Sequence, residues 1–263
     1  MITLTDGTVL DPIKFPANPS STEQESFRYQ KIKGEEAYRV MGIGTVSDYD
    51  VVIPETYRGL PITEIGAHAF ENEQYISSIT ISDNITTIGE YAFDGCSSLT
   101  SVEIPDSVTS IGDNAFNGCS SLTSVACPTI AISYIPKANL QTIVITSGDS
   151  IPSNAFYKCS SLTSVVIGNG VTSIGDSAFE DCSSLTSVVI GGSVTSIGMW
   201  AFCWCSSLTS VYYKGTASEW SAISINSTGN SSLTNATKYY YSETEPTSSG
   251  NYWHDVDGVP TKW

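Results

Sequence analysis

Residues Leu99–Cys119 read LTSVEIPDSVTSIGDNAFNGC, and two serines follow them. The dipeptide Ala-Phe in this stretch recurs along the chain, with the phenylalanines 23 residues apart except for one interval of 40. The six phenylalanines are Phe70, Phe93, Phe116, Phe156, Phe179 and Phe202. An isoleucine stands five residues before each of them, and Ser-Ser-Leu-Thr-Ser-Val occurs five times. Self-similarity at a fixed interval of this length predicts an array of stacked repeats.

The spacing within one repeat predicts a coil built from short extended segments. Val102 and Ile104 are two residues apart, so they would face the same side of a strand, and Pro105 would end that strand. Residues 113–116 are expected to form a short helical or 3₁₀ turn. Because one coil cannot bury its apolar side chains alone, successive coils must stack on one another. The pattern therefore predicts a right-handed solenoid of about seven 23-residue coils, capped at both ends.

The same pattern divides the chain into four regions. Residues 1–26 contain three prolines and are expected to form an extended leader or linker, and residues 27–59 an N-terminal cap. Residues 60–211 form the predicted solenoid, and the aromatic-rich residues 212–263 a C-terminal cap. The 40-residue interval predicts one irregular coil at about 126–150. Its Tyr134 is either a recognition site for a partner or part of a decayed repeat.

Five cysteines occupy one repeat position, three residues after each of the last five phenylalanines. They are Cys96, Cys119, Cys159, Cys182 and Cys205. The total of seven is odd, and neither a Cys-x-x-Cys pair nor paired histidines accompany the five. We therefore expect buried free thiols in place of disulfides or a metal site. Together with the six phenylalanines they form the predicted structural ladder of the core.

The composition excludes several classes of partner. The chain has 263 residues, only 14% of them charged, and a net charge of −16. A surface this acidic repels phosphate backbones, so nucleic acid is not expected as a partner. No run of 18 apolar residues occurs, so no membrane insertion is expected. The first residues lack a basic region followed by an apolar stretch, so the sequence predicts no signal peptide at its start.

Residues with catalytic chemistry are few. His68 and His254 are the only histidines, and neither belongs to a recognisable pair or triad. The segment Gly42-Ile43-Gly44 is too short for a phosphate loop. We expect no enzyme activity, no cofactor and no metal.

The remaining candidates for binding lie on the outward face of the predicted strands. Glu103 flanks the inward Val102, and Val166, Val189 and Tyr212 take the same position in later repeats. These three apolar side chains would form a strip that either docks a partner or reflects β-propensity alone. We therefore name Glu103, Tyr134, Val166, Val189 and Tyr212 as candidate partner-binding residues.

The repeat Ile-Gly-x-x-Ala-Phe-x-x-Cys-x-x-Leu-x-x-Val-x-Ile-Pro-x-x-Val-x-x-Ile-Gly resembles the BspA-like leucine-rich repeat, over roughly residues 27–263. The resemblance implies an α/β leucine-rich repeat solenoid on a bacterial cell surface or in the extracellular space. It also implies adhesion to host matrix proteins or other cells without catalysis. It supplies no binding residues at defined motif positions.

The expected function is that of a non-enzymatic cell-surface or secreted binding protein. We expect a monomer whose partner is an extracellular protein, a host matrix or cell-surface ligand, or a glycan. Three alternatives stay open. The first is a carbohydrate-binding module that uses the C-terminal rings of Trp220, Trp253 or Trp263 as stacking platforms. The second is a structural, receptor-binding component of a phage or prophage. The third is ice binding by the repeated Thr-Ser ladder, which lacks the Thr-x-Thr alternation that favours it.

Overall fold

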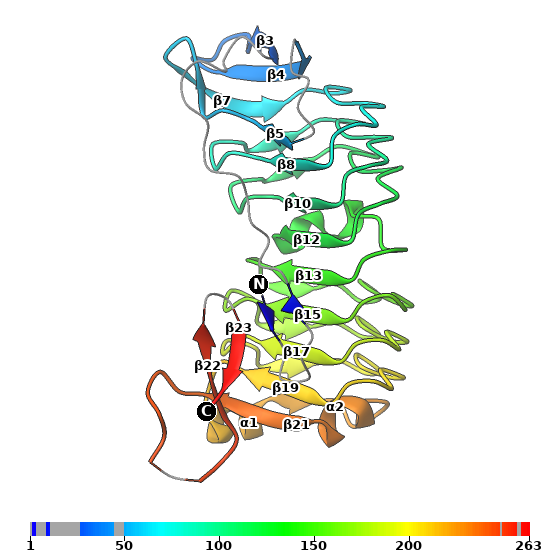
Figure 1. The fold of residues 1–263 in the computed structure, drawn as a ribbon, viewed down its shortest axis with the longest axis vertical. Coiled ribbons are helices and arrows are strands. Elements are labelled where there is room, and N and C mark those ends of the chain that lie inside the picture. The colour runs from blue at the N-terminus through cyan, green and yellow to red at the C-terminus, as the bar shows by residue number, and fades with distance from the viewer. Residues whose placement is uncertain (1, 4–8, 11–26, 45–49, 248, 257–258) are drawn as a thin grey trace. The chain divides into compact units, whose positions relative to one another are not determined.

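The computed structural model describes residues 2–3, 9–10, 27–44, 50–247, 249–256 and 259–263. The chain divides into two compact units, residues 15–140 and residues 141–263 together with residues 1–14. Each unit contains a stack of short coils (Figure 1). Most of the expected leader, residues 1–26, lies outside the described residues. Within it, strands β1 (Ile2–Thr3) and β2 (Val9–Leu10) pair antiparallel.

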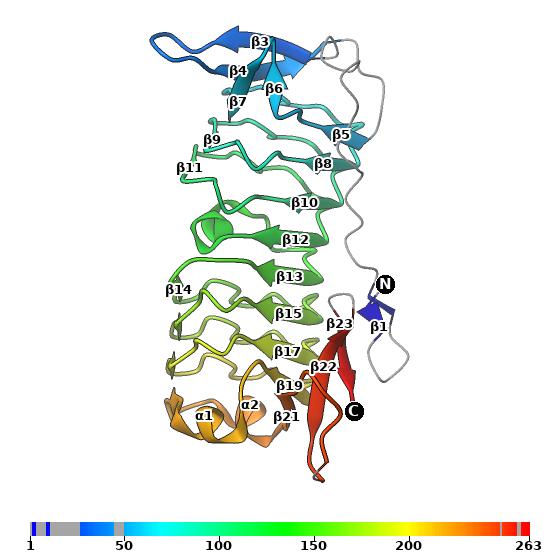
Figure 2. The same ribbon diagram turned by 90° about the vertical axis from the view of Figure 1, so that its left-hand side faces the viewer.

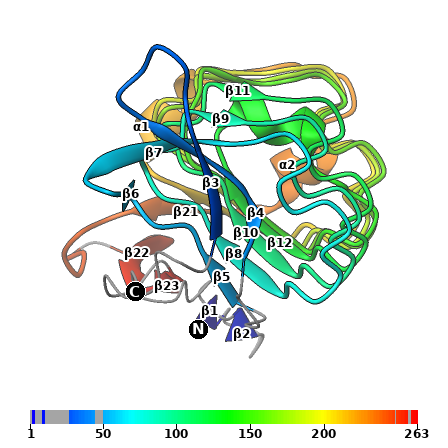
Figure 3. The same cartoon turned by 90° about the horizontal axis from the view of Figure 1, so that it is seen from above.

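Residues 15–140 carry one parallel strand per coil. The strands are β5 (Asp50–Val52), β8 (Ser78–Thr80), β10 (Ser101–Glu103) and β12 (Ser124–Cys127). Their register aligns Ile79, Val102 and Val125, which are all buried. The residues on either side of these three point outward, since side chains alternate along a strand. Seen from above, the coils of this unit overlie one another (Figure 3).

A second sheet lies along another side of the same coils. Its strands are β3 (Phe27–Lys31), β4 (Tyr38–Ile43), β7 (Leu60–Ile65), β9 (Thr87–Ile88) and β11 (Ser110–Ile111). β3 and β4 form an antiparallel hairpin, and β4 pairs in parallel with β7. The short β6 (Thr56–Tyr57) also pairs with β7, antiparallel. The hairpin thus supplies a partner for the open edge of the first coil, which would otherwise expose unpaired backbone groups.

Residues 141–263 repeat this architecture. The parallel strands are β13 (Thr142–Ile145), β15 (Ser164–Ile167), β17 (Ser187–Ile190), β19 (Ser210–Tyr213) and β21 (Thr237–Tyr241). β22 (Tyr252–Val256) pairs in parallel with β21, and β23 (Val259–Lys262) pairs antiparallel with β22. The second sheet consists of β14 (Ser150–Ile151), β16 (Ser173–Ile174), β18 (Ser196–Ile197) and β20 (Ser224–Ile225). Two short helices, α1 (Ala217–Ala222) and α2 (Ser231–Asn235), belong to the last coil.

One phenylalanine per regular coil forms the centre of each stack, and all six rings are fully buried. The ring centroids of Phe70, Phe93 and Phe116 are separated by 5.2 and 5.1 Å in turn. Those of Phe156, Phe179 and Phe202 are separated by 5.2 and 5.1 Å. The separation follows from the strand spacing of roughly 4.7–4.9 Å, which places equivalent side chains in van der Waals contact.

The repeated cysteines tie each coil to the one before it. The thiol donates a hydrogen bond to the carbonyl oxygen of the phenylalanine one coil earlier, at 3.1–3.2 Å. The pairs are Cys96–Phe70, Cys119–Phe93, Cys182–Phe156 and Cys205–Phe179. All five repeated cysteines are buried and free.

The Ala-Phe segments, for which the sequence predicted a short helical or 3₁₀ turn, are successive hydrogen-bonded turns. The residue two positions before each phenylalanine is left-handed, with φ between 53° and 59° in all six coils. This conformation directs alternate amides toward the next coil, in a pattern that we call the turn ladder. The amide nitrogens of Tyr91, Phe93 and Gly95 donate to the carbonyl oxygens of Asp113, Ala115 and Asn117 at 3.0, 2.8 and 2.9 Å. Hydrogen bonds between coils thus satisfy alternate amides, and the amides between them donate three residues back within the turn, as from Ala92 to Gly89 at 3.3 Å.

One coil lacks this turn. After β12, Pro128 introduces a 3₁₀ helix, η2 (Thr129–Tyr134), which takes the place of the Ala-Phe segment. Its Ala131 and Ile132 are buried and replace the missing phenylalanine as apolar filling. The helix lies in the segment that the sequence marked as irregular.

The strands that mark successive coils are β5, β8, β10 and β12 in the first unit and β13, β15, β17, β19 and β21 in the second. They number nine in the described residues. The solenoid is confirmed, but about seven coils were expected. The two additional strands are β5 and β21, which lie in the regions assigned to the caps. Neither carries the leucine of the Leu-x-x-Val spacing. The sequence predicted extended segments at Val51–Pro54 and Tyr239–Tyr241 but counted them with the caps.

Candidate binding surfaces

The apolar strip of Val166, Val189 and Tyr212 is covered by the chain itself. Val189 and Tyr212 are only 5% and 1% exposed, and Val166 is half-buried. The ring of Trp253 on β22 lies edge-on to Tyr212 with centroids 5.7 Å apart. Its indole nitrogen donates to the carbonyl oxygen of Tyr213 at 3.0 Å. The expectation that this strip is exposed is therefore wrong, because β22 returns across the outward face of β17 and β19 (Figure 2).

Glu103 lies on the outward face of β10, half-buried between the register partners Thr80 and Ala126. It lines a hollow of about 280 Å³ together with Glu55 and Asp83. Burial raises the pKa of the Glu103 carboxyl, and the nearby carboxylates of Asp83 and Asp106 raise it further. Glu103 is thus partly exposed to solvent, whereas Val189 and Tyr212, at the same repeat position, are buried.

Two hydroxyl groups in the same hollow add to its polarity. The side-chain oxygens of Thr80 and Ser82 are enclosed and have no hydrogen-bond partner among the described residues. Both side chains lie beside Glu103 in the lining. A buried hydroxyl without a partner is unfavourable, so this hollow favours contact with a polar group.

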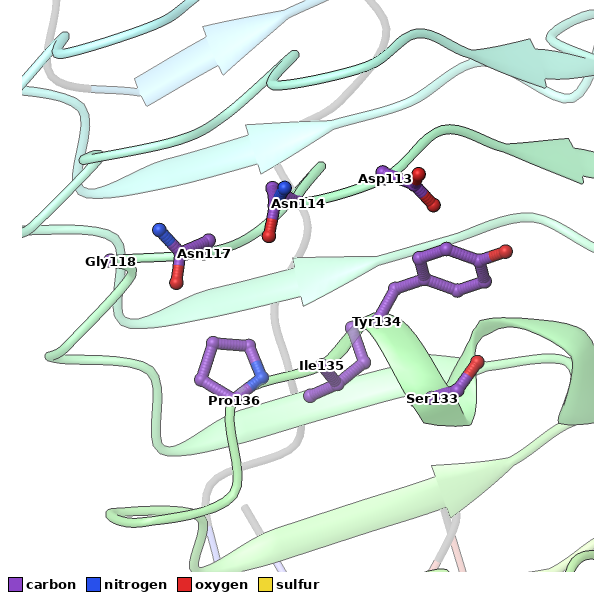
Figure 4. A pocket seen from close by; sticks show the side chains of 8 residues that line it. All are labelled: Asp113, Asn114, Asn117, Gly118, Ser133, Tyr134, Ile135 and Pro136. Atoms are coloured by element: carbon purple, nitrogen blue, oxygen red, sulfur yellow. The ribbon is translucent and has the colours of Figure 1, made fainter.

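Tyr134 ends η2 and lines a larger hollow of about 510 Å³. Figure 4 shows Asp113, Asn114 and Asn117 from the preceding turn on one side of it, and Tyr134 with Pro136 on the other. The side chains of Asp113 and Asn114 are exposed and make no hydrogen bond to another described residue. The sequence singled out Tyr134 but not the polar residues opposite it, because only the stacking of coils brings them together.

Metal-binding groupings are not found in the described part of the chain. No group of three or more His, Cys, Asp or Glu side chains there could hold a metal ion. His68 contacts Glu71 at 2.9 Å through Nδ1, and its ring stacks on Tyr91. Among the described residues, no helix has the length and apolar character that a bilayer crossing demands.

The family model for the BspA type leucine rich repeat region matches residues 63–142 and 134–239, with six copies. The chain belongs to the BspA-type leucine-rich repeat family. The hollow at Tyr134 lies within this BspA-type region, whereas the hollow at Glu103 combines residues of that region with Val52, Ile53 and Glu55, which precede it.

Solved structures include similar leucine-rich repeat proteins. A leucine-rich repeat protein of T. pallidum is 27% identical, with 74% of this chain and 81% of that one covered and a TM-score of 0.44. A leucine rich cell surface protein of Faecalibacterium prausnitzii is 28% identical, with 75% and 55% covered and a TM-score of 0.46. The chain therefore spans about half of the latter's length. No curated protein matches the chain.

Each BspA-type repeat assigns part of its side chains to the core. The phenylalanine, the cysteine and the inward leucine, valine and isoleucine of each repeat are buried. The family fold is a repeat-based protein-interaction scaffold. The positions left for binding are outward ones such as Glu103, or places where a coil departs from the repeat, such as η2.

Proposed function

We propose that this chain is a non-enzymatic binding protein of the bacterial cell surface or extracellular space, and that it holds a partner protein on the strand face of residues 50–127. The observation that carries the proposal is the difference in cover between the two strand faces. Ser78, Ser101 and Ser124 align in register on the first face and are half-buried. The equivalent Ser164 and Ser187 on the second face are 5% and 6% exposed, and Ser210 there is half-buried. The outward Val189 and Tyr212 of that face are 5% and 1% exposed, whereas Glu103 on the first face is half-buried.

The chemistry of the first face fits a partner with basic and hydroxyl groups. Asp50 accepts hydrogen bonds from the hydroxyls of Ser77 and Ser78 at 3.0 and 2.7 Å, which fixes this acidic corner. Glu55, Asp83 and Glu103 follow around the hollow of about 280 Å³. Carboxylates on a rigid sheet attract a basic patch and orient its approach, so they increase the association rate more than the final affinity.

The test is the binding of the intact protein to a panel of purified extracellular matrix proteins, measured by biolayer interferometry. The variant Glu103→Lys reverses the charge at the centre of the face, and we expect at least about tenfold weaker binding, or roughly 1.4 kcal/mol. The matched control is Glu90→Lys, which makes the same charge change in an exposed turn of the same unit. Binding that is insensitive to Glu103→Lys, or equally weakened by Glu90→Lys, would contradict this face as the docking site.

Surface location is tested separately on intact cells. Antibody against the chain should label unpermeabilised cells, and protease added outside should remove the label. Label that appears only after lysis would contradict the extracellular part of the proposal.

A further inference from the structure

The turn ladder is interrupted once inside the first unit, at residues 114–118. In the two preceding turns, which contain Phe70 and Phe93, three alternate backbone amides donate to carbonyl oxygens of the next coil. Asn154, Phe156 and Lys158 do the same in the second unit, to Asp176, Ala178 and Glu180 at 2.9, 2.7 and 2.8 Å. The amides of Asn114, Phe116 and Gly118 have no acceptor among the described residues. The next coil has η2 where its Ala-Phe turn would lie, so the carbonyls that these amides would meet are missing.

The chain fills a comparable gap elsewhere, which shows that the open amides are not a general feature of the fold. At the last regular coil, the amide of Phe202 donates to Oδ1 of Asn230 at 3.0 Å. Asn230 is 1% exposed, and its Nδ2 donates to the carbonyl oxygens of Gly198 and Asn226. A buried side chain thus caps that end of the ladder. At residues 114–118 the hollow of about 510 Å³ lies in its place.

We propose that this hollow binds a neutral saccharide. Its lining offers acceptors and donors together: the Asp113 carboxylate, the Asn117 carboxamide oxygen, and the amides of Asn114 and Gly118. Nδ2 of Asn117 is held by Oδ1 of Asp94 at 2.8 Å, which leaves its oxygen as the free end. Each sugar hydroxyl both donates and accepts, so it can bridge a carboxylate and an amide N–H. An acceptor-only anion such as sulfate would instead be repelled by Asp113.

Shape and apolar surface also agree with a saccharide. The half-buried ring of Tyr134 and the ring of Pro136 form the opposite wall (Figure 4). An aromatic face supports the apolar C–H face of a sugar ring while the hydroxyls reach the polar wall. A volume of about 510 Å³ lies within the usual range of roughly 300–1,000 Å³ for small-ligand sites. Gly118 allows this turn to approach the preceding coil closely, because a Cβ there would lie 3.0 Å from the Gly95 amide nitrogen.

The experiment titrates the full chain with maltose, cellobiose and N-acetyllactosamine, each at millimolar concentration, and follows the backbone amides by ¹⁵N NMR. We expect at least one disaccharide to shift the Asn114 and Gly118 resonances in a saturable way. Tyr134→Ala should weaken this binding about tenfold, which corresponds to roughly 1.4 kcal/mol of ring contact. The Asn114 carboxamide also lines the hollow, beside the Asn114 backbone amide. Asn114→Gly keeps the left-handed backbone and its N–H and removes this carboxamide, so it should weaken binding without unfolding the coil.

The matched control is Asn154→Gly, at the same left-handed turn position but with its amide already bonded to Asp176. It should bind the disaccharide as the unmodified chain does. The proposal is overturned if none of the three sugars shifts these amides, or if the two Gly variants bind alike. It is also overturned if a sulfated disaccharide binds more tightly, or if an extended peptide and no sugar occupies the amides. Because Glu103 lies outside this hollow, these outcomes are independent of the partner-protein test.

Discussion

Cys203 differs from the other six cysteines, all of which lie within the described ranges. It is partly exposed, and the others are buried. Burial raises the pKa of Cys96, Cys119, Cys127 and Cys205 to about 12. The pKa of Cys203 is raised as well, by its smaller burial and then by the carboxylate of Glu180. The thiolate is the reactive form, so a higher pKa and lack of access both suppress reaction.

The reactivity of the thiols follows from this difference. At pH 8 a thiol with a pKa of about 12 is ionised in roughly one molecule in ten thousand. We expect the folded chain to react with a thiol-specific disulfide reagent at Cys203 alone, and the unfolded chain at all seven cysteines. Cys203→Ser should remove the rapid phase seen before denaturation. A second cysteine that reacts rapidly in the folded chain would show that the thiol ladder opens.

At the scale of one element, each regular coil packs one fully buried phenylalanine ring against the rings of neighbouring coils. Phe179 has a ring on each side at 5.2 and 5.1 Å, whereas Tyr157 lies in the neighbouring turn and is 42% exposed. Large apolar side chains in a close-packed interior leave a cavity when truncated. The two residues therefore provide a direct comparison of buried and exposed aromatic rings in one unit.

Phe179→Ala should lower the free energy of unfolding by about 3–5 kcal/mol, because it removes the ring and leaves a cavity between two others. Tyr157→Ala should change it by no more than about 0.5 kcal/mol. The measurement is urea denaturation followed by circular dichroism. Equal midpoints for the two variants would contradict the placement of Phe179 in the core.

The elements that the sequence predicted correctly are those that repeat. The strands at Val102 and Val125, the phenylalanine stack and the buried cysteines all follow from a pattern repeated at a 23-residue interval. The turn conformation could not be predicted, because His, Tyr, Asn, Ser and Trp share the left-handed position and only hydrogen bonds between coils impose it. The hollow at Tyr134 also depends on stacking, which no local propensity encodes.

At the scale of the whole chain, the largest difference from expectation is at the C-terminal end. The aromatic residues there were expected to cover the last coil, but Trp253 covers the outward strand face of its unit. It is fully buried, so it cannot serve as a platform for a sugar ring. Trp263 is 46% exposed and donates through its indole nitrogen to the carbonyl of Ser242. The sequence composition indicated that aromatic rings pack at this end, but it could not indicate that β22 crosses the strand face of the same unit.

Trp253→Ala should expose the strip of Val189 and Tyr212 and destabilise its unit by about 3–5 kcal/mol. We expect increased binding of a hydrophobic dye and a larger apparent mass by light scattering, because an uncovered apolar strip on a strand face promotes association. Trp263→Ala, which removes an indole of the same size at a partly exposed position, is the control and should stay at the mass of the unmodified chain. Unchanged dye binding in Trp253→Ala would show that β22 does not depend on this ring.

The left-handed turn positions form a row along each unit, and these rows tolerate sequence change. Left-handed backbone disfavours any L-residue by roughly 1–2 kcal/mol, and asparagine least among those found here. That penalty arises in the main chain and is separate from the packing of the phenylalanines. His68, Tyr91, Asn114, Asn154, Ser177 and Trp200 can therefore occupy equivalent places over one unchanged interior. Such a row can acquire a new specificity by single substitutions while folding continues to rest on residues that never contact the ligand.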